Sequence, residues 1–220
     1  MTDAASTSPI GQPLTDAGLH AACEALGAPS RNLWAVLLVE SSGFGFLNDR
    51  RPKVLFERHI FHRLTAGRFD RTAPDLSNPL PGGYGPVGPR QHQRLAAAMA
   101  LDATAAVQAA SWGLGQVLGE LFAPCGYESA AAFVADARRG EDEQLLAMAR
   151  LIRADNLHLA LANEDWPRFA RGYNGAGYRR AGYDRKLREA VASLEREGLP
   201  DLTRRAAMLD RAYAEAVSRA

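Results

Sequence analysis

The sequence is poor in the residues that mark disulfide-bonded, metal-binding and membrane-spanning proteins. Its 220 residues include two cysteines, Cys23 and Cys125, and five histidines. Two distant thiols without a C-x-x-C pair do not make the disulfide framework of a small secreted domain. No apolar run approaches the ~20 residues that cross a bilayer, and residues 1–12 do not resemble a signal peptide. We therefore expect a protein made in the cytoplasm, without membrane insertion, that reaches any external substrate through another agent.

The sequence also lacks an excess of charge of either sign. Its 26 basic and 25 acidic residues give a net charge of +1, so nothing indicates a nucleic-acid partner. With 47% hydrophobic and 23% charged residues, the composition is that of an ordinary folded chain of one domain. We expect a flexible tail over residues 1–12, a single domain over residues 13–220, and a monomer.

What is present is mainly a helical pattern. Capping residues, apolar periodicity and Gly/Pro stops predict helices from Thr15 or Asp16 to Leu26, from Ser30 to near Gly43, and over 91–109, 111–122, 141–161, 183–197 and 201–219. Two β-prone runs, 44–47 and 53–56, flank a turn-like segment and predict a small hairpin. The Pro- and Gly-rich stretch 72–89 predicts an irregular loop. The expected fold class is mainly α, with one small β-hairpin after the second helix.

Glu40 is the first candidate for chemistry. On the second predicted helix, Leu33, Val36, Leu37 and Glu40 fall at i, i+3, i+4 and i+7, so they share one face. The carboxyl group then lies where the apolar stripe meets the core, and burial raises a carboxyl pKa. Such a group suits general acid catalysis near neutral pH, although a helix-end Glu that points into solvent has the same pattern.

Two later segments combine glycines with polar side chains that can hydrogen-bond a ligand. These side chains are Ser111 and Gln116 in S-W-G-L-G-Q, and Tyr173 and Asn174 in R-G-Y-N-G. The glycines would let backbone approach a ligand closely. Each segment alone is equally typical of a helix start or a turn, so neither identifies a function by itself.

The three segments in this order resemble a known family. Glu40-Ser41, then G-L-G-Q at 113–116, then Tyr173-Asn174 resemble the motifs of goose-type lysozymes and lytic transglycosylases. F-L-N-D at 46–49, R-P-K-V-L-F-E-R-H at 51–59, P-G-G-Y-G at 81–85 and D-W at 165–166 extend the similarity. The chain resembles most closely the phage-type N-acetylmuramidases of endolysins and prophages, within the lysozyme-like superfamily, over about residues 33–187. Arg50 departs from the pattern, where a glycine is expected.

The resemblance implies a lysozyme-like fold and an enzyme that cleaves peptidoglycan between N-acetylmuramic acid and N-acetylglucosamine, as in endolysin-like lysis of the bacterial wall. Glu40 would protonate the bridging oxygen as an oxocarbenium-like transition state forms. No metal or cofactor is expected. The substrate partner would be bacterial peptidoglycan.

The identity of a second carboxylate stays open at this point. Glu57 alternates with Val54 and Phe56 along the predicted hairpin and could face the cleft, or it could form a structural ion pair. Asp49, in the turn, is the other candidate. By the resemblance, Tyr173 would orient Glu40, while Ser111, Gln116 and Asn174 would hold N-acetyl groups or ring hydroxyls.

Three other functions fit parts of the sequence. A lytic transglycosylase needs one Glu and yields anhydro-muropeptides without water. A metal-dependent wall peptidase could use Glu57, His59 and His62, although no H-E-x-x-H motif is present. A non-catalytic wall-binding protein would not need Glu40.

Overall fold

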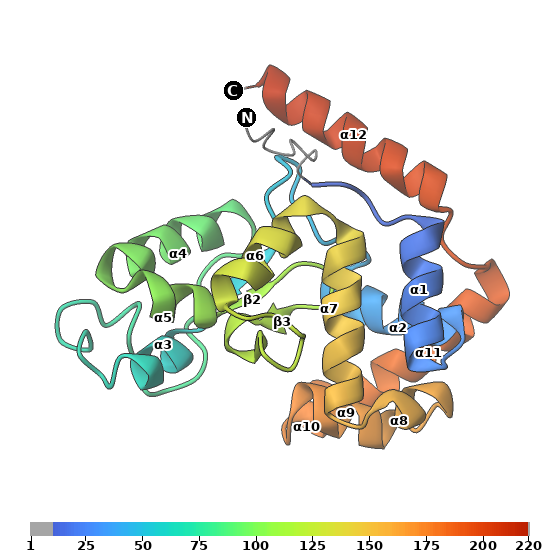
Figure 1. The fold of residues 1–220 in the computed structure, drawn as a ribbon, viewed down its shortest axis with the longest axis horizontal. Coiled ribbons are helices and arrows are strands. Elements are labelled where there is room, and N and C mark those ends of the chain that lie inside the picture. Colours follow the sequence, from blue (N-terminus) through green and yellow to red (C-terminus); the bar gives the residue numbers. More distant parts are fainter. Residues whose placement is uncertain (1–10, 220) are drawn as a thin grey trace, which may run out of the picture.

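The computed structural model of the chain describes residues 11–219, and these form two lobes on either side of a small sheet (Figure 1). The elements are α1 (Asp16–Leu26), α2 (Ser30–Ser41), β1 (Val54–Phe56), α3 (Arg58–Leu64), α4 (Pro89–Leu101), α5 (Ala103–Gln108), β2 (Ala110–Trp112), β3 (Val117–Leu118), a 3-10 turn (Gly119–Leu121), α6 (Ala130–Arg139), α7 (Glu141–Ala154), α8 (His158–Ala162), α9 (Trp166–Asn174), α10 (Tyr178–Ala181), α11 (Tyr183–Glu197) and α12 (Leu202–Ser218). One lobe holds α3, α4 and α5, and the other holds α1, α2 and α7–α11.

Helix α2 lies in the core of the larger lobe. The side chains of Leu33, Val36 and Leu37 are fully buried, and each such side chain contributes about 1.5–3 kcal/mol relative to an exposed one. Helix α11 packs against both α2 and α9, and α1 packs against α7. Helix α2 ends at Ser41, and the next two residues, Ser42 and Gly43, both have positive φ values (58° and 78°). These contacts fix the end of α2, where Glu40 lies.

The sheet joins segments that are far apart in sequence. Strand β2 is central and pairs antiparallel with β1 and β3. In the register, Leu55 lies opposite Ser111, and Ser111 lies opposite Leu118. Side chains directly opposite each other in antiparallel strands lie on the same face of the sheet. The sheet therefore carries Leu55 and Ser111 on one face.

The predicted hairpin over 44–56 is only partly present. The Lys53 amide donates to the Gly45 carbonyl (2.7 Å), and one isolated bridge joins Phe46 to Pro52. Strand β1 pairs instead with β2. Arg50 occupies the turn with φ 64°, a left-handed conformation that glycine adopts without strain, which explains why glycine is the residue expected there.

Three predicted helices differ from the observed elements. Residues 111–122 form β2, a turn, β3 and the 3-10 turn, because Gly113 and Gln116 have positive φ values (66° and 48°). Segment 91–109 divides into α4 and α5 at Asp102, which is extended and accepts from the Ala105 amide (3.0 Å). Segment 141–161 divides into α7 and α8 around Asn156, with φ 57°.

Helices α1, α2, α11 and α12 agree with the prediction to within about two residues, and Thr15 caps α1 by accepting from the Gly18 amide (3.0 Å). Helices α3, α6, α9 and α10 were not predicted. They have four to ten residues, and so short an element has little hydrophobic periodicity to detect.

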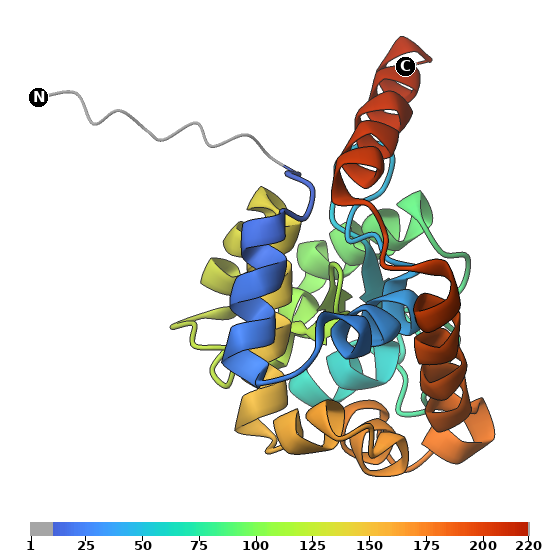
Figure 2. The same cartoon turned by 90° about the vertical axis from the view of Figure 1, so that its right-hand side faces the viewer.

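The first described residues pair with the end of α6. Residues 1–10 of the predicted tail lie outside the described part. The amides of Gly11 and Gln12 donate to the Arg138 and Arg139 carbonyls (3.0 and 2.8 Å), so these two residues belong to the folded structure. Helix α12 projects from the larger lobe beside the 44–53 loop (Figure 2). Within residues 11–219, no helix has the length and apolar character needed to cross a membrane.

Candidate active site

Glu40 lies in the last turn of α2, on the face that carries the buried apolar stripe. Burial raises the pKa of its carboxyl group above the ordinary value, and a hydrogen bond from Asn174 and the charge of Lys186 oppose this increase. The Asn174 amide nitrogen donates to Glu40 Oε1 at 2.7 Å. The carboxyl is thus held in one orientation and keeps its proton to a higher pH than a solvated Glu does.

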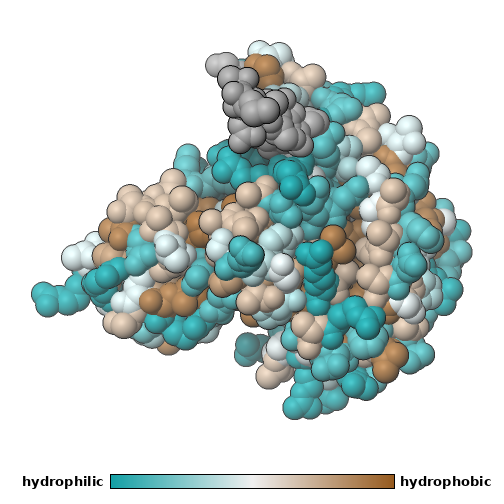
Figure 3. All heavy atoms as spheres, viewed as in Figure 1, coloured by the Kyte–Doolittle hydropathy of each residue, from teal (hydrophilic) through white to brown (hydrophobic). Residues whose placement is uncertain are grey.

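A cavity of about 410 Å³ opens beside this carboxyl group. Its walls come from both lobes and from the sheet: Glu40, Ser41, Ser42, Leu47, Lys53, Val54, Leu55, Val87, Gly88 and Gln116. Figure 3 shows the molecular surface hollowed between the two lobes. The volume falls within the range of ligand sites, which is about 300–1,000 Å³. The cavity brings Glu40 and Gln116 together, as the sequence predicted.

Gln116 is held in the turn between β2 and β3. Its side-chain amide donates to the Gly113 carbonyl (2.9 Å). The glycines of this turn face α7, since a Cβ on Gly113 would lie 2.3 Å from the Gln144 side chain and a Cβ on Gly115 would lie 2.7 Å from Met148. Their small size therefore allows the turn to pack against α7. The sequence had suggested a different reason, the close approach of a ligand.

Gln144 is a residue of the site region that sequence reasoning missed. It is buried on α7. Its side-chain oxygen Oε1 accepts a hydrogen bond from the Leu114 backbone amide (2.7 Å), and its side-chain nitrogen Nε2 donates to the Ala137 carbonyl (2.7 Å). It thereby fixes the backbone of the G-L-G-Q turn. A polar residue within an amphipathic pattern is normally interpreted as facing solvent, so no sequence signal indicates this role.

Tyr173 and Asn174 differ from their expected contacts. The Tyr173 hydroxyl donates to the Gly115 carbonyl (2.7 Å), and its ring stacks on Phe169 at 5.4 Å between centroids. Burial, and then the charge of Glu40, raise the Tyr173 pKa well above its usual range. Tyr173 therefore braces the turn, while Asn174, expected to hold the sugar, makes the contact to Glu40 that Tyr173 was expected to make.

Ser111 lies in the central strand and is 7% exposed. It shares a sheet face with its cross-strand partner Leu55, and Leu55 lines the cavity beside Glu40. Ser111 itself is not among the residues that line this cavity.

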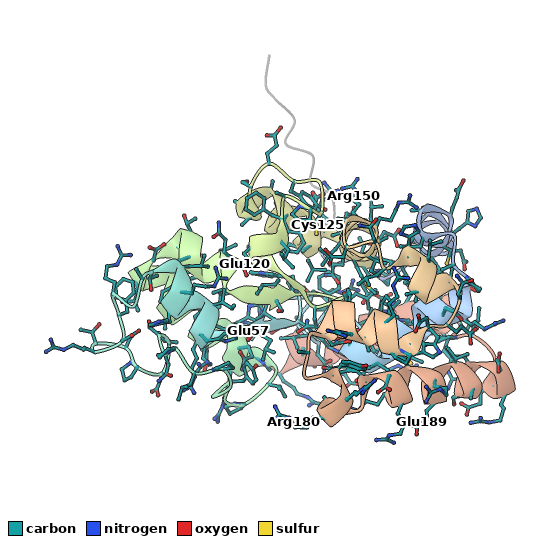
Figure 4. The ribbon with its side chains drawn as sticks, turned by 90° about the horizontal axis from the view of Figure 1, so that it is seen from below. Glu57, Glu120, Cys125, Arg150, Arg180 and Glu189 are labelled. Atoms are coloured by element: carbon teal, nitrogen blue, oxygen red, sulfur yellow. The ribbon has the colours of Figure 1, made fainter. Side chains whose placement is uncertain are left out.

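Glu57 follows β1 directly and precedes α3. Its amide donates to the Ala109 carbonyl (2.8 Å), which continues the strand pairing by one residue. Because side chains alternate along a strand, Glu57 lies on the same face as Leu55, which lines the cavity with Glu40. Glu57 itself is not among the residues that line this cavity. Figure 4 shows Glu57 beside the sheet, between the lobe of α3 and the helices of the other lobe.

The surroundings of Glu57 favour its protonated form. Its side chain is 18% exposed and lies 3.4 Å from His59 Nδ1. Burial raises its pKa, and His59 and a hydrogen bond with Tyr84 oppose this increase. The distance between the Glu57 carboxyl group and His59 Nδ1 exceeds that of a good hydrogen bond. Glu57 and His59 therefore do not form a strong hydrogen-bonded ion pair.

Asp49, the other candidate for the second carboxylate, is paired with the neighbouring Arg51. Both Arg51 side-chain nitrogens that contact it are close, at 2.6 and 2.9 Å. Burial acts to raise the Asp49 pKa, but the hydrogen bonds from Arg51 outweigh it and hold the pKa below the ordinary value. Asp49 also lines a different cavity, together with Arg50 and Tyr213. The structure thus separates Asp49 from Glu40.

The metal-peptidase alternative relied on Glu57, His59 and His62. His62 Nδ1 instead contacts Asp70 at 2.8 Å. In the described part of the chain, no three His, Cys, Asp or Glu side chains are grouped as metal ligands.

A buried ion pair secures the segment that follows α2. Glu141, fully buried at the start of α7, is 2.5 and 2.7 Å from the two terminal nitrogens of Arg205 on α12. Glu141 also accepts from the Gly45 amide (2.6 Å), and Arg205 Nε donates to the Gly43 carbonyl (2.8 Å). Breaking such a pair by removing one partner costs about 3–5 kcal/mol.

Comparison with known proteins agrees with this geometry. A sequence model of the N-acetylmuramidase family matches residues 29–195. The chain belongs to the N-acetylmuramidase family. It is therefore a glycoside hydrolase that acts on peptidoglycan, which confirms the function and fold class that the motifs implied.

The structure of this muramidase is also similar to one described as the crystal structure of Burkholderia AP3 phage endolysin. The TM-score is 0.76 at 38% sequence identity, and the match covers 86% of this chain and 73% of the other. The chain matches none of the curated proteins with which it was compared. Helix α12 lies beyond the residues that the family model matches.

Replacing Asn174 by alanine tests whether it controls Glu40. Because Asn174 lowers the Glu40 pKa, its loss should raise that pKa further and move the alkaline limb of the kcat/KM profile to higher pH. A freer carboxyl should also lower kcat by about tenfold to a hundredfold, since small displacements carry penalties of that order. The matched control is Asn163→Ala, at an exposed position. An unchanged alkaline limb would contradict the role.

Proposed function

We propose that Glu40 is the general acid with which this muramidase cleaves the bond between N-acetylmuramic acid and N-acetylglucosamine. The observation that supports this most is the position of its carboxyl group, part-buried at the wall of a cavity and hydrogen-bonded by Asn174. Burial keeps the acid protonated where a solvated Glu has ionised. It can then deliver a proton to the leaving oxygen of the sugar.

We propose Glu57 as the second carboxylate. Its place on the Leu55 face of the strand supports this, since Leu55 lines the cavity with Glu40. The group would position a water on the far face of the sugar or stabilise the developing positive charge. If cleavage inverts the anomeric centre, the two carboxyl groups should be separated by roughly 6.5–9.5 Å.

The remaining polar residues divide into two roles in this proposal. Gln116, which lines the cavity, would hold N-acetyl groups or ring hydroxyls together with Ser111, which shares a sheet face with Leu55. Tyr173 and Asn174 act as positioning residues for the turn and for Glu40, as their hydrogen bonds to Gly115 and Glu40 suggest.

We further propose an endolysin-like role for the protein, as a monomer whose catalytic domain spans residues 13–220. The similarity to a phage endolysin supports this. The enzyme would be made in the cytoplasm, would not insert into membranes, and would reach the wall after release or export by another agent.

Digestion in heavy-oxygen water separates hydrolysis from transglycosylation. In hydrolysis the oxygen of water enters the new reducing end, so the released muramic acid should gain one ¹⁸O atom. A transglycosylase closes the ring with the sugar's own hydroxyl, and its products carry no label. Mass spectrometry should therefore find labelled reducing ends, and a digest of unlabelled anhydro-muropeptides would assign the other reaction.

A further inference from the structure

The cavity beside Glu40 has a neighbouring cavity on the side of α12. A second cavity, of about 230 Å³, shares Leu47 and Lys53 with the first. The residues that line it come from the 44–53 loop and from α12: Phe44, Phe46, Leu47, Asn48, Lys53, Met208, Leu209 and Ala212. In Figures 1 and 2 the light-blue 44–53 loop lies against α12. The two cavities thus adjoin at Leu47 and Lys53, between Glu40 and the C-terminal helix.

The second cavity is lined mainly by apolar side chains, with one cation where it adjoins the first cavity. The side chains that line the second cavity include no carboxylate, and Lys53 is the charged group among them. The Lys53 ammonium donates one hydrogen bond, to the Ser41 carbonyl at 2.7 Å. An ammonium group carries three donors, so two remain for an anion. Burial lowers the Lys53 pKa, and an anion bound there would restore it.

The substrate carries a group of the matching kind at the matching place. N-acetylmuramic acid bears, on its lactyl substituent, a short peptide that combines alanine residues with free carboxylates. When the bond at C1 of this sugar lies at Glu40, the peptide leaves the same ring from C3, two carbons from the scissile bond. A space of 230 Å³ is smaller than the usual ligand site of about 300–1,000 Å³, so it would take only the first residues of the peptide.

We propose that the second cavity, which we call the α12 subsite, binds the stem peptide of peptidoglycan, with Lys53 at a peptide carboxylate and Met208 and Ala212 against alanine side chains. The inference rests on the proposed cleavage beside muramic acid. Met208 is 54% exposed, and a bound peptide would cover part of it. The wall of this subsite that α12 provides lies outside the residues that the family model matches, whereas the 44–53 loop lies within them.

The test compares two substrates and two variants. Ala212→Trp fills the α12 subsite, while Ala214→Trp adds the same side chain at an exposed position of the same helix. Both enzymes digest purified peptidoglycan and the same glycan after an amidase has removed its stem peptides. Ala212→Trp should lose about tenfold or more in kcat/KM on the peptide-bearing glycan, since burial of one apolar side chain contributes on that order.

The same variant should keep its parental rate on the peptide-free glycan, and Ala214→Trp should keep both rates. Equal losses on both glycans, or no loss on either, would overturn the α12 subsite. If the parental enzyme released no muramic-acid reducing ends from either glycan, the proposed cleavage beside muramic acid would be wrong, and the α12 subsite would be wrong with it. Met208→Glu provides a second variant, which should show the same selective loss because its carboxylate repels that of the peptide.

Discussion

Replacing Glu40 by glutamine is expected to lower the rate of peptidoglycan cleavage at least about a hundredfold, because the loss of a general acid has an effect of that order. Glutamine keeps the size of the side chain and can still accept the hydrogen bond from Asn174. It cannot supply a proton. The rate of muropeptide release by the purified variant is the measurement.

The stability of the same variant should move in the opposite direction. Burial raises the Glu40 pKa in the folded state, so the group's contribution to stability is fully present below the unfolded pKa and is lost as the pH rises through the folded pKa. Above the folded pKa the ionised carboxyl group therefore destabilises the fold, and at such a pH Glu40→Gln should have an equal or higher Tm. The control is Glu24→Gln, at an exposed position on α1. A folded Glu40→Gln protein with more than about a tenth of parental activity would refute the assignment, since the expected loss is ~100-fold.

Replacing Glu57 by glutamine is expected to have the second largest effect, a loss in kcat of about a hundredfold. Burial raises the Glu57 pKa in the folded state, so by the same sign its ionised form does not stabilise the protein at neutral pH. The Tm should therefore change little. Steady-state kinetics and thermal unfolding of the same preparation measure both quantities.

Two comparisons complete this experiment. Glu128→Gln, at an exposed position, should change neither kcat nor Tm. If Glu57 were only a structural partner of His59, the variant would lose Tm and keep its kcat per folded molecule. That pattern would leave the reaction with no second carboxylate among the candidates, because Asp49 is paired with Arg51.

Helix α2, which carries Glu40, could be predicted because its signal is local. Leu33, Val36, Leu37 and Glu40 share a face by helical geometry alone, and that face is buried as predicted. The contact between Glu40 and Asn174 joins residues 134 positions apart. No periodicity encodes such a contact, and only the resemblance to a family brought the two segments together.

The errors have equally specific causes. Helix α9 was not predicted, and neighbours on a helix point about 100° apart, so the sequence could not show whether Tyr173 or Asn174 faces Glu40. The segment after Ser111 has the small first residues and apolar continuation of a helix, but two left-handed residues, Gly113 and Gln116, turn it into a strand pair. The pairing of β1 with β2 depends on a register across more than fifty residues.

Mass spectrometry of the fragments released from purified peptidoglycan tests the central claim most directly, with the parental enzyme and Glu40→Gln digested side by side. The account predicts that the parental digest contains muropeptides with N-acetylmuramic acid at the new reducing ends and with intact stem peptides. The Glu40→Gln digest should lack them. Fragments with uncut glycan and cleaved peptides, or N-acetylglucosamine at the new reducing ends, would contradict the claim.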